Sequence, residues 1–166
     1  LQEGYGDAIY PKHKGDAPTS ILKSEYQNTL TNASIGYHQF ITHSPPKLGI
    51  HGTWDDHDYG GNDRGVEMPN KQSRLTAFYH FIMQSNRFTG KDYDVIDSIS
   101  AAGGARREGA YHSVSYGAFP RKVTVYFVDT RYSRSKHCIP SIASTRIPLG
   151  SVISCVARWI SSIVYP

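Results

Sequence analysis

Cysteine is scarce in this 166-residue sequence, and neither Cys138 nor Cys155 belongs to a CxxC pair. The sequence therefore indicates neither a zinc knuckle nor a disulfide framework. Basic clusters are also lacking, because the pairs Arg106-Arg107 and Arg121-Lys122 are short and have no aromatic residues patterned around them. Such pairs are typical of a solvated face, so the sequence does not indicate nucleic acid as a partner.

Acidic residues are missing from the last part of the chain. Residues 130–166 contain five basic side chains and no Asp or Glu, although the whole chain has a formal charge of only +4. An apolar stripe from Leu149 to Val164 predicts a helix in this tail, but Arg158 interrupts it and the stripe is too short to predict a membrane span. We expect this helix to pack on a protein core, with a membrane-surface helix as the second interpretation.

The remaining composition, with 39% apolar residues, indicates one globular domain or a piece of a larger one. Aromatic and aliphatic residues at helical intervals predict one or two helices over residues 18–41. A second apolar face predicts a helix that starts after Asn70: Leu75, Phe78, Tyr79, Ile82 and Met83. Residues 48–54 predict a short buried strand, residues 95–107 a loop, and residues 111–116 and 122–128 a β-hairpin.

The segment from Trp54 to Asp63 gathers four carboxylates around one histidine. The carboxylates are Asp55, Asp56, Asp58 and Asp63, and the histidine is His57. Like charges this close repel one another unless a cation compensates them, so a bound metal is the simplest explanation. A solvated acidic loop is the alternative, but the aromatic flanks and the preceding strand favour a site.

A calcium-binding EF-hand is a second metal interpretation of this segment. Four residues fall on positions 1, 3, 6 and 12 of such a loop: Asp56, Asp58, Gly61 and Glu67. An EF-hand also requires a helix that enters the loop, and Pro45-Pro46 together with the glycines that follow forbids one. We therefore reject the EF-hand.

Three separated motifs resemble those of the PhoD-like (alkaline phosphatase D type) phosphatases of the calcineurin-like metallophosphoesterase superfamily. The motifs are Gly6-Asp7-Ala8-Ile9-Tyr10, the run Trp54 to Asp63, and Val128-Asp129-Thr130-Arg131-Tyr132. They occur in the order found in that family. The resemblance implies that residues 1–134 are a partial domain of this family, a partial two-sheet α/β sandwich, and that residues 135–166 are an atypical basic and apolar tail.

The resemblance also implies a role for each motif residue. Asp7 matches an aspartate that bridges two metal ions, and Asp56 should bind the second ion. His57 should donate a proton to the leaving oxygen or stabilise its charge, and Asp58 should orient the His57 imidazole. Tyr10 matches a phenolate ligand of ferric iron, with a core aromatic as an equal alternative.

Two further residues have more than one possible role. Asp55 binds metal, caps a turn or only shapes the local field. Arg131 either holds phosphate by a bidentate contact or forms a structural ion pair with Asp129.

The function that the resemblance implies is a metal-dependent phosphoesterase. Two ions, iron with calcium, zinc or manganese, would activate a hydroxide that hydrolyses a phosphate monoester or diester. A noncatalytic metal-binding or interaction module is the alternative. The family is secreted or membrane-associated, but these residues leave the localisation open. The sequence begins at Leu1 and lacks the family's upstream strand and downstream histidine loops, so we expect a fragment with little activity of its own.

Overall fold

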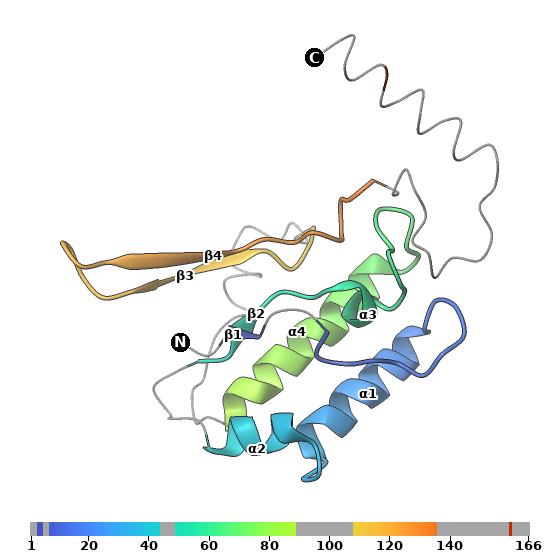
Figure 1. The fold of residues 1–166 in the computed structure, drawn as a ribbon, viewed down its shortest axis with the longest axis horizontal. Helices are drawn as coiled ribbons and strands as arrows, with labels where there is room; N and C mark the ends of the chain where they lie inside the picture. The colour runs from blue at the N-terminus through green and yellow to red at the C-terminus, as the bar shows by residue number, and fades with distance from the viewer. Residues whose placement is uncertain (1–2, 5–6, 44–48, 89–107, 136–159, 161–166) are drawn as a thin grey trace. The chain divides into compact units, whose positions relative to one another are not determined.

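The computed structural model describes residues 3–4, 7–43, 49–88, 108–135 and 160 (Figure 1). Its chain contacts define two units, Leu1–Arg134 and Ser135–Pro166. The predicted loop at 95–107 and the predicted tail helix lie outside the described residues. Among the helices of the described part, none is both long and apolar enough to cross a membrane.

The predicted helical region at 18–41 forms two helices, α1 (Thr19–Thr31) and α2 (Gly36–His43) (Figure 1). Pro18 stands immediately before α1, a position where its fixed φ suits a helix start. Between the helices, the side chain of Asn32 accepts a 3.0 Å hydrogen bond from the amide of Ser34, which stabilises a turn. The buried residues of α1 lie on one face: Leu22, Tyr26, Thr29 and Leu30.

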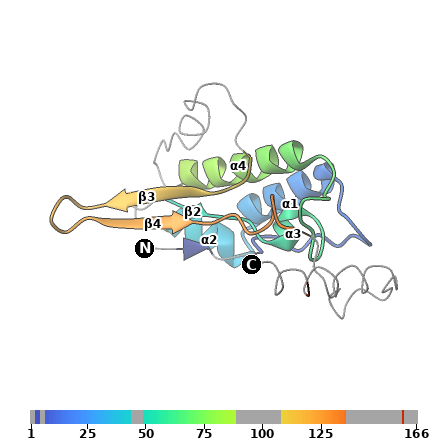
Figure 2. The ribbon, with the colours of Figure 1, turned by 90° about the horizontal axis from the view of Figure 1, so that it is seen from above.

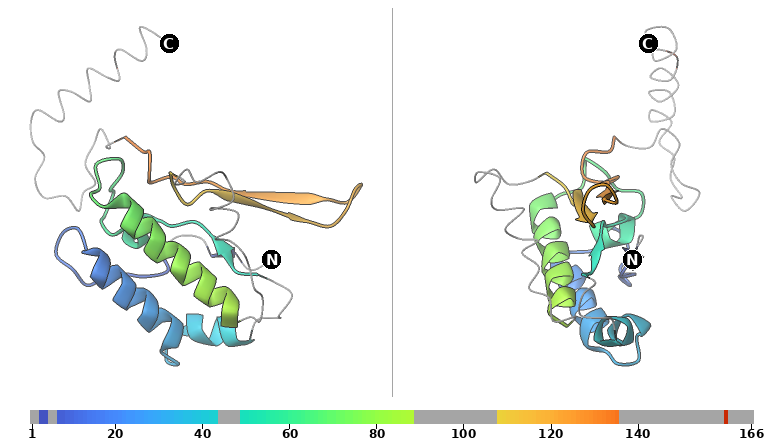
Figure 3. Two further views of the ribbon diagram at one scale, coloured as in Figure 1. Left: turned by 180° about the vertical axis from the view of Figure 1, so that it is seen from behind. Right: turned by 90° about the vertical axis from the view of Figure 1, so that its left-hand side faces the viewer.

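The second predicted helix is α4 (Lys71–Phe88), which packs lengthwise on α1 (Figure 3). Four of its five predicted apolar positions are buried, and Met83 is half-buried. Tyr26 of α1 stacks on Phe81 of α4 with ring centroids 4.7 Å apart. Burying each such aromatic ring contributes about 1.5–3 kcal/mol, so this contact anchors the helical part of the core.

The predicted strand at 48–54 is much shorter in the structure. Only β2 (His51–Gly52) is a strand, and it pairs in parallel with β1 (Glu3–Gly4). The backbone of Ile50, just before β2, is bonded by a side chain of α4. Asn86 of α4 accepts a hydrogen bond from the Ile50 amide at 2.6 Å and donates one to the Ile50 carbonyl at 2.9 Å.

The predicted hairpin is confirmed as β3 (His112–Tyr116) and β4 (Val123–Phe127), paired antiparallel (Figure 2). On one face, the Phe127 ring stacks on the His112 ring with centroids 4.5 Å apart. On the other face, the hydroxyls of Ser115 and Thr124 are 2.9 Å apart. Helices with short parallel and antiparallel strands make the described part of unit 1 a mixed α/β fold.

Candidate metal centre

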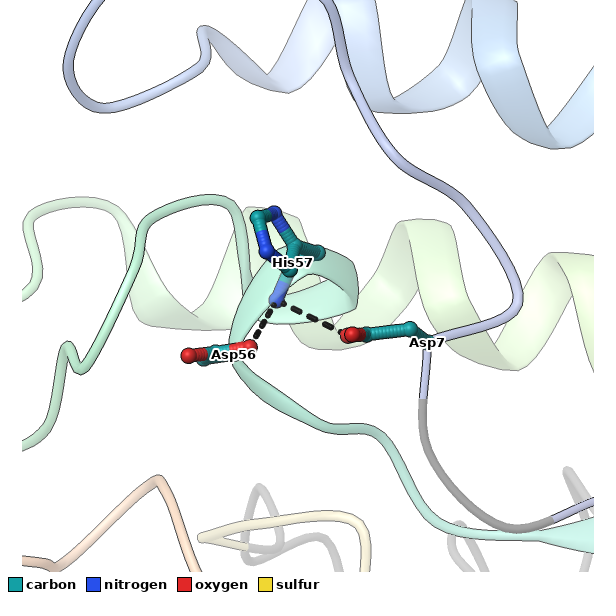
Figure 4. Close-up of side chains that lie close together, drawn as sticks. All are labelled: Asp7, Asp56 and His57. Atoms are coloured by element: carbon teal, nitrogen blue, oxygen red, sulfur yellow. Dashed lines mark hydrogen bonds between the residues drawn. The ribbon is translucent and has the colours of Figure 1, made fainter. Parts of the chain in front are cut away.

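The acidic residues singled out above lie where two parallel strands end. Because β1 and β2 run in the same direction, the segments that follow them leave from one edge. Asp7 lies on the segment after β1, and Asp56 and His57 lie on the segment after β2 (Figure 4). The carboxyl ends of parallel strands are the usual place for sites in α/β sheets.

A single helical turn, α3 (Asp56–Tyr59), fixes the acidic segment. Asp55 and Asp58 form a reciprocal capping box around its start, which explains how so acidic a segment becomes helical. Gly60 ends the turn with φ of 104°, a conformation that favours glycine. Residues 49–55 contain β2 and no helix, so the helix that would enter an EF-hand loop is absent there.

The turn places three donor groups around one point. A ligand atom from each of Asp7, Asp56 and His57 lies within 4.8 Å of the other two. The backbone amide of His57 lies between the two carboxylates and donates to Asp7 Oδ1 at 3.2 Å and to Asp56 Oδ1 at 2.9 Å (Figure 4). Asp56 is only 9% exposed, and its Oδ2 accepts a 3.0 Å hydrogen bond from the Asp63 amide.

Tyr10 lies beside this cluster and is not part of the core. Its side chain is 64% exposed, and its ring centroid is 4.7 Å from that of His57. A hydrogen bond to the Asp7 carboxylate and the negative charge of that group raise the pKa of the Tyr10 hydroxyl. The interpretation of Tyr10 as a core aromatic is therefore wrong, because Asp7 and His57 hold the ring at the protein surface.

The predicted contact between Asp58 and the His57 imidazole is not formed. Neighbouring residues on a helical turn point in different directions, so the two side chains do not face each other. Asp58 is 1% exposed, and its carboxylate accepts hydrogen bonds from the backbone amides of Ala8, Ile9 and Asp55, each at 3.2 Å. Burial raises the pKa of Asp58 to about 7 despite these bonds.

Arg131 pairs with Asp55, and not with Asp129 as one of the two interpretations held. The guanidinium Nε donates to Asp55 Oδ1 at 2.7 Å, and Nη2 bonds the same oxygen. Nη2 also lies 3.9 Å from Asp56 Oδ2. The third nitrogen, Nη1, is buried and has no hydrogen-bond partner. Arg131 is thus the cation that contacts the acidic cluster in the described residues.

The carboxylate of Asp129 bonds backbone amides, which explains why it is not the partner of the Arg131 guanidinium. Its carboxylate accepts backbone hydrogen bonds from Ala110 at 2.6 Å, Arg131 at 2.7 Å and Tyr132 at 2.9 Å. These bonds shape the chain after β4 into a turn. The turn directs the Arg131 side chain to α3.

Sequence reasoning missed Arg74, which supports the loop after α3. Arg74 is only 3% exposed, and its guanidinium donates to the carbonyl oxygens of Tyr59 at 2.9 Å, Ala17 at 2.8 Å and Pro69 at 3.0 Å. Burial lowers its pKa. The available signal was its place beside the apolar face of the predicted helix, where a polar residue is expected to satisfy buried backbone groups.

The charges around the cluster favour a cation. Three carboxylates lie in or next to it, those of Asp7, Asp55 and Asp56, and Arg131 offsets only part of their charge. Two carboxylates and one imidazole form a donor set that suits iron, zinc or manganese. The residues therefore fit one metal ion through three ligands. In the described ranges, this is the one group of three such donors.

No protein-family model matches this chain, and the comparisons with curated proteins and with solved structures give no significant match.

Proposed function

We propose that this chain carries the metal site of a phosphoesterase of the PhoD-like type, built on part of a two-sheet α/β sandwich. The observation that carries the proposal is the convergence of Asp7, Asp56 and His57 at the ends of two parallel strands. A solvated acidic loop would leave its carboxylates exposed, whereas Asp56 is only 9% exposed. The motif resemblance supports the same assignment.

Each residue around the cluster has a part in this chemistry. A bound ion would polarise the phosphate and acidify a water molecule. Asp7 and Asp56 would hold the ion, with the Tyr10 hydroxyl beside Asp7 as a further donor. His57 has two ring nitrogens, so it would bind the ion through one or pass a proton to the leaving oxygen.

Arg131 supplies a second positive charge for the phosphate. Its Nη1 is buried without a partner, and its Nη2 lies near Asp56, so a phosphate oxygen at the ion would find a donor already in place. A guanidinium is well suited to this task because its parallel N–H groups match two phosphate oxygens. The bond to Asp55 keeps the guanidinium oriented while the site is empty of substrate.

A noncatalytic metal-binding module is the second candidate. The observation that favours it is the donor count, because the described residues provide three ligands for one ion, whereas binuclear hydrolysis requires two ions. Binding of phosphate separates the two candidates, since only a phosphoesterase needs an open position for phosphate next to the ion.

The test measures Mn²⁺ binding and then phosphate binding by calorimetry on the full chain. We expect Mn²⁺ to bind the native chain and to be lost in Asp56→Ala, with Asp16→Ala as a control aspartate outside the cluster. Inorganic phosphate should bind only when Mn²⁺ is present, and more weakly in Arg131→Met. Absence of Mn²⁺ binding would refute the proposal, and Mn²⁺ binding without phosphate binding would favour the noncatalytic module.

A further inference from the structure

The two segments that carry the donor groups are joined by few backbone contacts. β1 and β2 are paired only at Glu3↔His51 and Gly4↔Gly52. Beyond them, among the described residues, the hydrogen bonds between residues 7–10 and residues 53–60 are made by the carboxylates of Asp7 and Asp58. Side chains thus replace the strand ladder where the site lies.

Of these two carboxylates, only Asp58 is available as a permanent connection. Asp7 belongs to the donor cluster, and an ion would compete for its oxygens. Asp58 is fully buried and lies outside the cluster, so its oxygens remain on the protein whether or not an ion is bound. Its Oδ2 accepts from both Ala8 and Asp55, and its Oδ1 accepts from Ile9.

From this geometry we infer that Asp58 is the positioning residue of the metal site, an inference that rests on the proposed function. It joins the backbone next to Asp7 with the backbone next to Asp56, so the donor groups keep their separation without the ion. Asp7 and Asp56 would otherwise move apart, because their charges repel each other in the metal-free protein. A site that is preformed binds its ligand more tightly, since binding does not have to order the loops.

Neighbouring contacts show that Asp58 is itself held in place. The backbone carbonyl of Asp58 accepts a 3.1 Å hydrogen bond from the hydroxyl of Tyr26 on α1. Tyr26 in turn stacks on Phe81 of α4. The two donor segments are thus held in place by contacts with the helical core and not by contacts at the surface.

The experiment compares the full chain with Asp58→Ala, which removes all three hydrogen bonds, and with Asp58→Asn, which keeps one acceptor oxygen. Amide hydrogen exchange is followed by NMR without metal, and Mn²⁺ affinity is then measured at a temperature where every variant is folded. We expect faster exchange at Ala8, Ile9 and Asp55, and a fall in Mn²⁺ affinity of about 10–100-fold in Asp58→Ala, with Asp58→Asn between it and the native chain.

Ile41→Ala and Ile41→Val serve as controls. Ile41 is fully buried in α2, and it takes no part in the hydrogen bonds that join the two donor segments. They should lower the Tm while Mn²⁺ affinity and exchange at Ala8 and Ile9 stay native. Native exchange at these amides in the Asp58 variants, or an Mn²⁺ affinity no weaker than in the Ile41 variants, would overturn the inference. A native chain that binds no Mn²⁺ refutes the proposed function instead, together with the metal-binding half of this inference.

Discussion

The guanidinium of Arg131 lies on the carboxylate of Asp55, which is also the residue that caps α3. This ion pair joins residues 76 positions apart in the sequence and connects the turn after β4 to the start of the acidic segment. The Arg131 side chain is 12% exposed and that of Asp55 is 39% exposed. The pair is therefore partly shielded from solvent, and its strength can be measured.

We expect a coupling of about 1 kcal/mol between Arg131 and Asp55 in a double-mutant cycle with Arg131→Met and Asp55→Ala. The free energy of unfolding from urea denaturation provides the four values of the cycle. The pair of Arg64 with Asp16, at 2.7 Å, is the control, because its side chains are 40% and 29% exposed and solvent screens them more. A coupling at Arg131 no larger than that of the control pair would contradict this reading of the contact.

The stability of the metal-free protein should fall as the pH rises from about 4 to 7. Asp58 has a folded-state pKa of about 7, above its unfolded value of about 3.9, so the folded state binds the proton more tightly. The resulting stabilisation is complete below pH 4 and is lost as the pH passes 7. Urea denaturation in the presence of a chelator, repeated across this range, measures the effect, which amounts to at most about 4 kcal/mol.

Asp58→Asn is the comparison for that experiment, because it cannot titrate at this position. Its stability should start lower, since one acceptor oxygen is lost, and should lack this fall between pH 4 and 7. An identical fall in the variant and the native protein would show that another group is responsible.

Three glycine substitutions should differ sharply in how much they lower the free energy of unfolding. Gly60→Ala should destabilise the protein by about 3 kcal/mol or more, because φ is 104° and the new Cβ would lie 1.8 Å from Nη1 of the buried Arg74. Gly15→Ala should cost about 1 kcal/mol, because φ is 86° but no atom lies within 4 Å. Gly36→Ala, in an open position of α2 with an ordinary φ, should be neutral or stabilising. Thermal unfolding ranks the three, and a Gly60→Ala variant as stable as Gly15→Ala would exclude the clash with Arg74.

Iron tests the role of Tyr10. A phenolate bound to ferric iron gives a visible charge-transfer band, and the Tyr10 hydroxyl already lies beside Asp7 of the cluster. We expect the iron-loaded protein to be coloured and Tyr10→Phe to be colourless, although the ring against His57 is kept. A band that survives in Tyr10→Phe would assign the colour to another ligand and leave Tyr10 as a neighbour of the site.

Local patterns in the sequence predicted α1, α2, α4 and the hairpin well. The spacing of Leu75, Phe78 and Ile82 predicted α4, because that face packs against the rest of the core. Alternation at Val123, Val125 and Phe127 predicted β4, although Phe127 alone of the three is buried and Val123 is exposed. The short β2 was less predictable, since the Asn86 side chain, far along the chain, bonds the backbone that precedes it.

The sequence predicted which residues form the candidate site, but not which contacts these residues make. The motifs named Asp7, Asp56 and His57, and the structure brings them together. The direction of the Asp58 side chain depends on the helical turn α3, which the run of acidic residues did not reveal. The partner of Arg131 lies on a distant segment, and sequence proximity to Asp129 pointed to the wrong carboxylate.

The parallel pairing of β1 with β2 has a consequence for how the chain folds. Both α1 and α2 lie between these strands in the sequence, so the two strands meet only after a long loop has closed. Non-local pairing of this kind is slow, because the entropy of closure is lost before the contact is gained. The packing of α1 on α4 also joins segments far apart in the sequence. Several long loops must therefore close before Asp7 reaches α3, and the donor cluster should be among the last parts of the molecule to assemble.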